Sequence, residues 1–306
     1  MDYLSLEISL VALIPAILLC IYVYAKDKVE KEPAGLLLIL FFAGAAACIP
    51  SSLLERAIVG WFDKLFEAQV SFGPDGTPYY QSVSADIAHK ALCSFLGFAL
   101  IQVIVKWLLV VLITRRSKHF NYLFDGIVYS VFVSLGYAAC ENIHYAAVNG
   151  WDRLSLRTVT TLPSHLFVGI VMGYCYTLWH FYSAAQKKEK QLVADKILDK
   201  RKIRSSVVWG IVNVAVPAVL FGVYSFAGSF TSGIMVTLFY ALVITTYIFC
   251  FVKIHSIAKN DTAGNVFVNR LILKFHPELD KSFFNREKAG DAESDENGIG
   301  GDFDAE

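Results

Sequence analysis

The long apolar runs of the chain hold a small set of polar side chains whose types could carry out acid–base chemistry. Gln102 and Lys106 are four residues apart in one run, so on a helix both side chains would lie on one face. Glu141 and Asn142 lie in a second run, and His165 lies in a third. A carboxylate beside an imidazole can activate water for hydrolysis. Because polar groups at membrane depth are costly and usually face the bundle interior, these five residues are the candidate catalytic set.

A metal site is the second chemistry that these residue types allow. His144 follows Glu141 by three residues, and Glu-x-x-His is the spacing of di-iron sites in helix bundles. With His165 these two residues are the candidate metal ligands, and zinc is the ion considered. Structural interpretations stay open beside the functional ones. Glu141 could form an interhelical ion pair with Lys106, while Asn142 could be an interhelical hydrogen bonder and His165 a core histidine.

Other polar residues near the ends of the apolar runs favour structural interpretations. Asp125 is expected to cap a helix at the cytoplasmic end of its run. Glu55 and Arg56 are expected to anchor their helix near a membrane interface, and Glu7 is expected to lie near the outer headgroups.

The composition indicates the elements that must position these residues. Of the 306 residues 56% are hydrophobic, and the mean hydropathy is +0.51, which favours an integral membrane protein in a lipid bilayer. The formal net charge is zero, so the composition gives no reason to expect nucleic acid as a partner. A membrane span needs about 20 mostly apolar residues. Seven runs qualify, which predicts an all-α polytopic bundle with spans at 4–25, 34–61, 87–114, 122–147, 158–184, 206–227 and 231–255.

Lysine and arginine concentrate in the first, third and fifth connections between these runs. Cytoplasmic loops carry an excess of these residues, so the N-terminus is expected outside and the C-terminus inside. We expect a transmembrane bundle over 1–255 and a cytoplasmic amphipathic segment over 256–284, lying on the membrane or packed on the bundle. The acidic, glycine-rich tail 285–306 is expected to be disordered.

Depth within the predicted spans can be counted along the chain. Glu141 lies about six residues before the outer end of its span, and His165 lies about seven residues after the outer start of the next. At a rise of about 1.5 Å per residue, both would lie about 10 Å below the outer surface. Gln102 would lie somewhat deeper and Lys106 one turn further in. The candidate residues can therefore converge in the outer half of the membrane.

Three motifs connect the chain to a known family. The stretches "YVYAKDKVEKEP" (Tyr22–Pro33), "FDGIVYSVFVSLGYAACENIHY" (Phe124–Tyr145) and "LPSHLFVGIVMGY" (Leu162–Tyr174) closely resemble the PrsW family of intramembrane proteases. Their order and spacing match over roughly residues 1–255. The family is distantly similar to the glutamate-dependent CAAX prenyl endopeptidases. The resemblance implies a multi-pass protein of the bacterial plasma membrane that hydrolyses a peptide bond in a single-span membrane protein, such as an anti-sigma factor.

The chain departs from the family pattern at two places. The family's first motif has two adjacent glutamates, two free positions and a lysine, and here Gln102, Val103 and Lys106 occupy them. Glutamine cannot take a proton from water at neutral pH. The family's last motif pairs a histidine with an aspartate or asparagine four residues on, where this chain has Phe221 and Ser225.

Three explanations of these departures stay open. The chain could be a divergent protease that works with Glu141 and His165, a pseudoprotease that binds membrane segments without cutting them, or an altered form of an active parent with glutamate at position 102. In an active form, the resemblance implies a general base at position 102. It also implies that His165 orients water or stabilises the oxyanion, that Lys106 gives electrostatic aid, and that Glu141 and Asn142 complete the site. A transporter is a remote alternative, since no inverted repeat is seen. The sequence assigns no oligomeric state.

Overall fold

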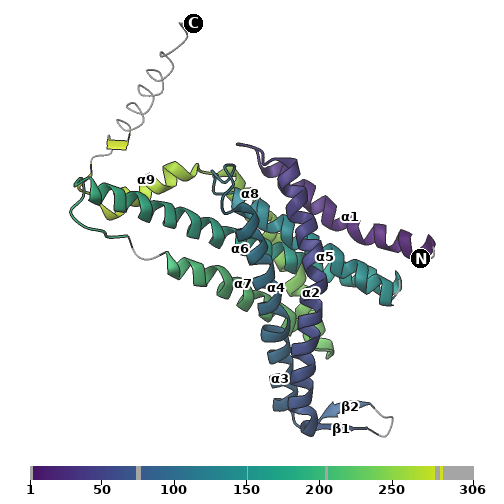
Figure 1. The fold of residues 1–306 in the computed structure, drawn as a ribbon. Helices are drawn as coiled ribbons and strands as arrows, with labels where there is room; N and C mark the ends of the chain where they lie inside the picture. Colours follow the sequence, from purple (N-terminus) through teal and green to yellow (C-terminus); the bar gives the residue numbers. More distant parts are fainter. Residues whose placement is uncertain (1–2, 74–76, 150, 204–205, 280–282, 285–306) are drawn as a thin grey trace, which may run out of the picture. The chain divides into compact units, whose positions relative to one another are not determined.

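The computed structural model describes residues 3–73, 77–149, 151–203, 206–279 and 283–284, and it describes side chains outside 3–12 and 148–156. Nearly all of this is helical (Figure 1). The elements are α1 (Tyr3–Lys26), α2 (Ala34–Phe66), η1 (Glu67–Gln69), β1 (Val70–Phe72), β2 (Pro78–Tyr80), α3 (Val83–Leu92), η2 (Cys93–Ala99), α4 (Leu100–Thr114), α5 (Asp125–Asn149), α6 (Trp151–Ala194), α7 (Val207–Gly228), α8 (Gly233–Lys259) and α9 (Gly264–Phe275).

The predicted all-α polytopic bundle is confirmed. Among the described residues, six helices are long and apolar enough to cross a membrane, and Leu13–Lys26 of α1 is a shorter apolar helix. The six spans are Ala34–Gln69, Val83–Thr114, Asp125–Ala147, Arg157–Ala194, Val207–Gly228 and Gly233–Lys259. The orientation of the termini stays a prediction. The side chain of Glu7 and the tail 285–306 lie outside the described residues.

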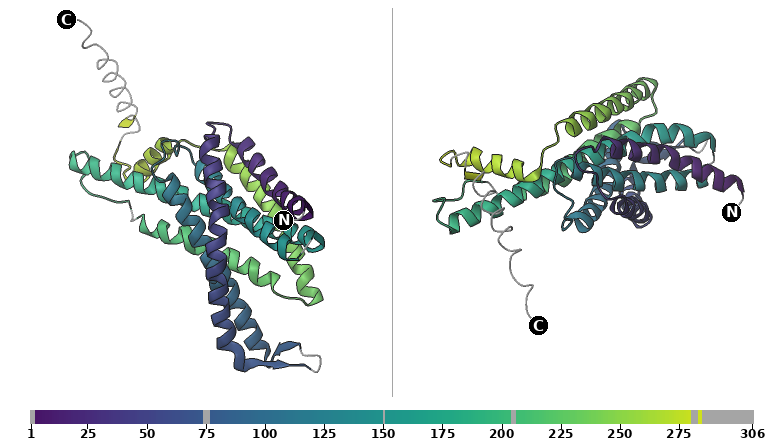
Figure 2. Two further views of the ribbon diagram at one scale, coloured as in Figure 1. Left: turned by 45° about the vertical axis from the view of Figure 1, so that its right-hand side comes forward. Right: turned by 90° about the horizontal axis from the view of Figure 1, so that it is seen from above.

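The connection after α2 holds a small hairpin. β1 and β2 pair antiparallel, with Val70 opposite Tyr80. The hairpin leads into α3, η2 and α4, which form one continuous helix from Val83 to Thr114. The η2 segment is π-helical. This helix runs beside α2 (Figures 1 and 2).

Helix α5 is the most buried of the membrane-spanning helices. Its backbone comes very close to α2, because a Cβ atom added at Gly136 would collide with the Phe41 carbonyl, and one added at Gly44 would collide with the Val133 carbonyl. Small residues let membrane helices approach closely and pack by van der Waals contact. The close crossing fixes α2 and α5 against each other and so fixes the side chains that they direct inward.

Contacts divide the chain into two compact units. The first unit comprises residues up to Trp179 together with Val207–Thr262, and it contains all the candidate residues. The second comprises His180–Ser206 and the chain from Ala263 onward. In the second unit the buried Glu189 carboxylate accepts hydrogen bonds from the backbone N–H groups of Lys202 and Ile203, at 2.6 and 2.9 Å.

Helix α9 lies within the second unit and in the segment predicted to be amphipathic. Its buried residues Val268, Leu271 and Ile272 have helical spacing and form one apolar face. The end of α9 is held by His276, whose Nε2 lies 2.7 Å from the Glu189 carboxylate.

A carboxylate cluster joins three connections at the predicted cytoplasmic end of the first unit. Asp27 accepts a hydrogen bond from the Glu32 backbone N–H, and Glu32 accepts one from the Tyr129 hydroxyl at 2.7 Å. Asp125 accepts hydrogen bonds from the backbone N–H groups of Asn121 and Tyr122, so it ties the preceding loop to the start of α5 and not, as a helix cap would, to the first N–H groups of the helix. Asp261 accepts one from the Phe124 backbone N–H at 2.9 Å.

The close crossing of α2 and α5 predicts a cost for the smallest added side chain. Gly136→Ala would press a methyl group against backbone, which cannot move aside as a flexible side chain can. We expect the free energy of unfolding in detergent to fall by about 1–3 kcal/mol. Gly35→Ala is the matched control, because a Cβ atom there meets nothing within 4 Å. Equal stability of the two variants would contradict the close crossing.

The carboxylate cluster predicts a pH dependence of stability. Burial raises the pKa of Asp27 to about 6 and that of Glu32 to about 7. The folded protein therefore holds these protons more tightly than the unfolded chain, so the stability they contribute is present at low pH and lost as the pH rises through about 7. We expect the thermal unfolding temperature to fall between pH 5 and pH 8, and to fall less in Glu32→Gln. The exposed-site variant Glu67→Gln should keep the wild-type slope, and an unchanged slope in Glu32→Gln would refute the assignment.

Candidate active site

Lys106 lies at the centre of the candidate residues and is fully buried. Its Nζ donates to Gln102 Oε1 one turn earlier on α4 and contacts His165 Nδ1 on α6, each at 3.1 Å. The ammonium also lies over the rings of Tyr137 and Phe221, 4.4 and 5.2 Å from the centroids. A buried ammonium needs such partners, because burying a charge without them is very costly. The predicted convergence of α4, α5 and α6 is therefore present around this lysine.

The contact with Lys106 fixes the tautomer of His165. An ammonium only donates hydrogen bonds, so Nδ1 must accept and the proton of the neutral imidazole lies on Nε2. His165 Nε2 lies 3.0 Å from Glu141 Oε2, so this N–H points at the carboxylate. The ring is 2% exposed and stacks on Tyr137, with centroids 6.0 Å apart. The imidazole is thus held in one orientation between a lysine and a glutamate.

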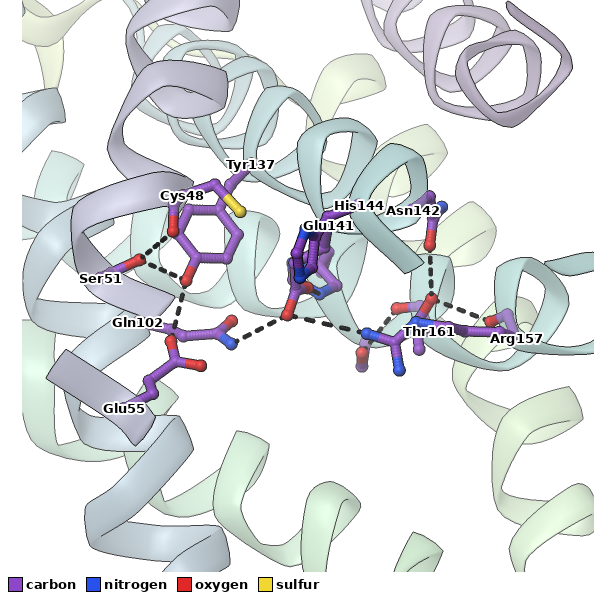
Figure 3. Close-up of polar contacts among 12 residues, drawn as sticks. Cys48, Ser51, Glu55, Gln102, Tyr137, Glu141, Asn142, His144, Arg157 and Thr161 are labelled. Carbon is purple, nitrogen blue, oxygen red and sulfur yellow. Dashed lines mark hydrogen bonds and ion pairs between the residues drawn. The ribbon is translucent and has the colours of Figure 1, made fainter. Parts of the chain in front are cut away.

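Glu141 receives donors from three sides, and Figure 3 shows two of them, Gln102 and Arg157. Besides His165, its Oε1 accepts from Gln102 Nε2 at 3.4 Å and lies 3.8 Å from an Arg157 guanidinium nitrogen. Arg157 is not among the residues that the sequence predicts for the site. It lies about two turns before His165 on the same helix, and helical spacing could have indicated that both reach one cavity.

These side chains line a cavity of about 710 Å³ within the first unit. Gln102, Glu141 and His165 all reach it, and Phe221 and Ser225 of the last motif lie in its wall. Phe221 packs edge-on against the His165 ring at 5.6 Å. A volume in this range is typical of ligand-binding cavities, with apolar walls and a few convergent polar groups.

Three of the predicted residues, Lys106, Asn142 and His144, do not line this cavity. Asn142 is buried, and its Oδ1 accepts from the Thr161 hydroxyl at 3.5 Å, so it joins α5 to α6. His144 is exposed and lies 3.0 Å from an Arg56 guanidinium nitrogen. Val103, in the second glutamate position, is fully buried.

The interpretation of Glu55 as an interfacial anchor is wrong. Glu55 is only 6% exposed, lines the cavity and accepts from the Tyr137 hydroxyl at 2.9 Å. A sequence signal did exist. Gly44, Cys48, Ser51 and Glu55 follow one another at helical spacing, and all four lie on the buried face of α2. Arg56, the next residue, is exposed.

The donor set does not fit a zinc centre. The described residues hold no group of three or more histidine, cysteine or acidic side chains placed to bind one ion. Glu141 and His165 meet, but His144 faces Arg56 instead of joining them. Lys106 contacts Nδ1 of the imidazole, so only the Nε2 that faces Glu141 is left for a metal. A catalytic zinc usually has three protein ligands.

Comparison with known proteins identifies relatives of the chain. Its residues 32–254 match the model of the family described as PrsW family intramembrane metalloprotease. A protein named Protease PrsW from Oceanobacillus iheyensis is 31% identical over 169 residues, which cover 55% of this chain and 67% of the relative. Relatives of the same name from Geobacillus kaustophilus and Bacillus subtilis are 29% and 27% identical, over 60% and 69% of this chain and 71% and 78% of their own lengths.

No solved structure matches the chain. The family model covers most of the described spans, and the resemblance seen in the three motifs is confirmed. Its relatives are named as proteases, and its helices are those of a multi-pass membrane protein. The chain therefore belongs to the PrsW family of intramembrane proteases.

Proposed function

We propose that the chain is an active intramembrane endopeptidase that hydrolyses a peptide bond in a single-span membrane protein of the bacterial plasma membrane. The observation that carries the proposal is the Glu141–His165 pair, held in one orientation by Lys106 at the wall of a cavity of about 710 Å³. A regulator such as an anti-sigma factor is the substrate class that the family resemblance favours.

The cavity holds groups that can stabilise the oxyanion and orient the reactants in peptide hydrolysis. Water must lose a proton as it attacks the carbonyl carbon, and the developing oxyanion must be stabilised. The Arg157 guanidinium reaches the cavity beside Glu141 and can donate to the oxyanion. His165 and Glu141 form a fixed polar wall against which water and substrate can be oriented. Such prior orientation lowers the entropic part of the barrier.

A binding protein without protease activity is the second candidate function. It is favoured by one observation, the absence of a carboxylate at positions 102 and 103. The Gln102 amide bridges Lys106 and Glu141 and so completes the polar network without supplying a base. The two candidate functions differ in whether the purified chain cuts a membrane peptide.

Cleavage of a single-span substrate in proteoliposomes separates the two functions. We expect the wild-type chain to cut, and Glu141→Gln to lower kcat by about a hundredfold or more, because it removes the charge that orients His165. Glu67→Gln, at an exposed glutamate, is the matched control and should keep wild-type turnover. If only Gln102→Glu cuts, the wild-type amide blocks a competent fold. If neither chain cuts, the protein binds membrane segments without hydrolysing them.

The donor set predicts independence from zinc. We expect purified, folded protein to contain far less than one zinc ion per chain by elemental analysis. His165→Ala should leave that metal content unchanged, and cleavage should proceed at the same rate after treatment with a zinc chelator. If the wild-type protein contains one zinc ion per chain and His165→Ala contains none, the prediction is wrong, and a further ligand completes the set of Glu141 and His165.

A further inference from the structure

We propose that Glu55 of α2 is the general base of the hydrolysis, supplying the carboxylate that positions 102 and 103 lack. This inference rests on the proposed protease function and names the residue that takes the proton from water. The sequence predicts that Glu55 anchors α2 at a membrane interface, which gives this residue no part in the chemistry. In the structure its side chain lies in the wall of the cavity, and this position assigns the role.

Glu141 is poorly suited to the role of base. His165 Nε2–H points at one of its oxygens, and the Gln102 amide and Arg157 guanidinium approach the other. Donors and cations around a carboxylate favour its ionised form and so weaken it as a proton acceptor. Glu141 therefore orients the imidazole and balances the nearby cations, and a different group must take the proton.

Glu55 is the second carboxylate in the cavity wall and has different surroundings. Among the described ion pairs several join a glutamate to a cation, and none of them includes Glu55. Its Oε1 accepts from the Tyr137 hydroxyl at 2.9 Å, and the Gln102 amide lies beside it (Figure 3). A buried carboxylate without a cation in contact is a stronger base than one that is paired.

The surrounding contacts hold Glu55 in one place. The Tyr137 hydroxyl that donates to it lies 2.6 Å from the Ser51 hydroxyl, one turn earlier on α2. The Tyr137 ring in turn stacks on His165, so the base and the imidazole share one support. Because Tyr137 fixes Oε1, Oε2 is the oxygen left to take a proton.

The reaction then balances with the residues present. A water molecule in the cavity gives a proton to Glu55 Oε2 while its oxygen forms a bond to the carbonyl carbon of the substrate. The oxyanion receives hydrogen bonds from Arg157 and the Gln102 amide. The proton on Glu55 passes to the peptide nitrogen, the C–N bond breaks, and the products are a carboxylic acid and an amine. Glu55 is ionised again at the end.

The same arrangement accounts for glutamine at position 102. A glutamate there would place a third carboxylate between Glu55 and Glu141, and neighbouring like charges raise the cost of ionising each. The amide instead donates to Glu141 and accepts from Lys106. Gln102 is thus a neutral donor between two acids.

The test compares cleavage by wild type, Glu55→Gln and the control Glu67→Gln in proteoliposomes. We expect Glu55→Gln to lower kcat by about a hundredfold or more at unchanged KM and unchanged unfolding temperature. The double variant Glu55→Gln/Gln102→Glu returns a carboxylate to the same cavity and should regain turnover, which a merely structural role of Glu55 would not explain. Wild-type turnover in Glu55→Gln overturns the assignment.

If Glu55→Gln does not fold, Glu55→Asp decides, because it keeps the charge and withdraws the carboxylate by one methylene. A tenfold or larger fall in kcat at wild-type KM supports the assignment, and wild-type kcat overturns it. The two proposals fail separately. If wild type and Glu55→Gln cut at the same rate, only the role of Glu55 is wrong. If neither wild type nor Gln102→Glu cuts, the proposed protease function is wrong, and the role of Glu55 is wrong with it.

Discussion

The buried ammonium of Lys106 is the constraint on which the rest of the site depends. A charge that is fully removed from water must be met by acceptors and polarisable groups, and here these are Gln102, His165 and two aromatic rings. Because Lys106 donates to Nδ1, the His165 proton lies on Nε2 and points at Glu141. One lysine on α4 therefore determines the orientation of a histidine on α6 and a glutamate on α5.

The packing of the bundle serves this arrangement. The glycines at the crossing of α2 and α5 bring two backbones together, and this closeness lets Ser51 and Glu55 of α2 reach Tyr137 of α5. A larger residue at the crossing would move α2 outward and withdraw both side chains. The packing of the helices therefore determines the geometry of the site, because membrane helices that meet through small residues have little freedom to shift.

The sequence predicted the spans and the convergence of Lys106, Glu141 and His165, because bilayer thickness fixes helix length and buried charges face inward. It misassigned Glu55, since the end of an apolar run looks the same whether its last polar residue faces headgroups or a cavity. It also missed Arg157, because α6 begins before its apolar run. Both errors concern which neighbour a helix face meets, and that depends on tertiary packing.

Charge balance relates the two departures from the family motifs. The cavity region holds two carboxylates, Glu55 and Glu141, and two cations, Lys106 and Arg157, while His165 is neutral in the tautomer described. The carboxylates and the cations are therefore equal in number, and this matters because an unbalanced charge costs much free energy to bury. Phe221, in the last-motif position of a histidine, offers Lys106 a ring face instead of a competing donor. The neutral residues at positions 102 and 221 are related, because each contacts the buried ammonium of Lys106 without adding a charge. The carboxylate of Glu55 on α2 then makes the number of negative charges equal to the number of positive charges.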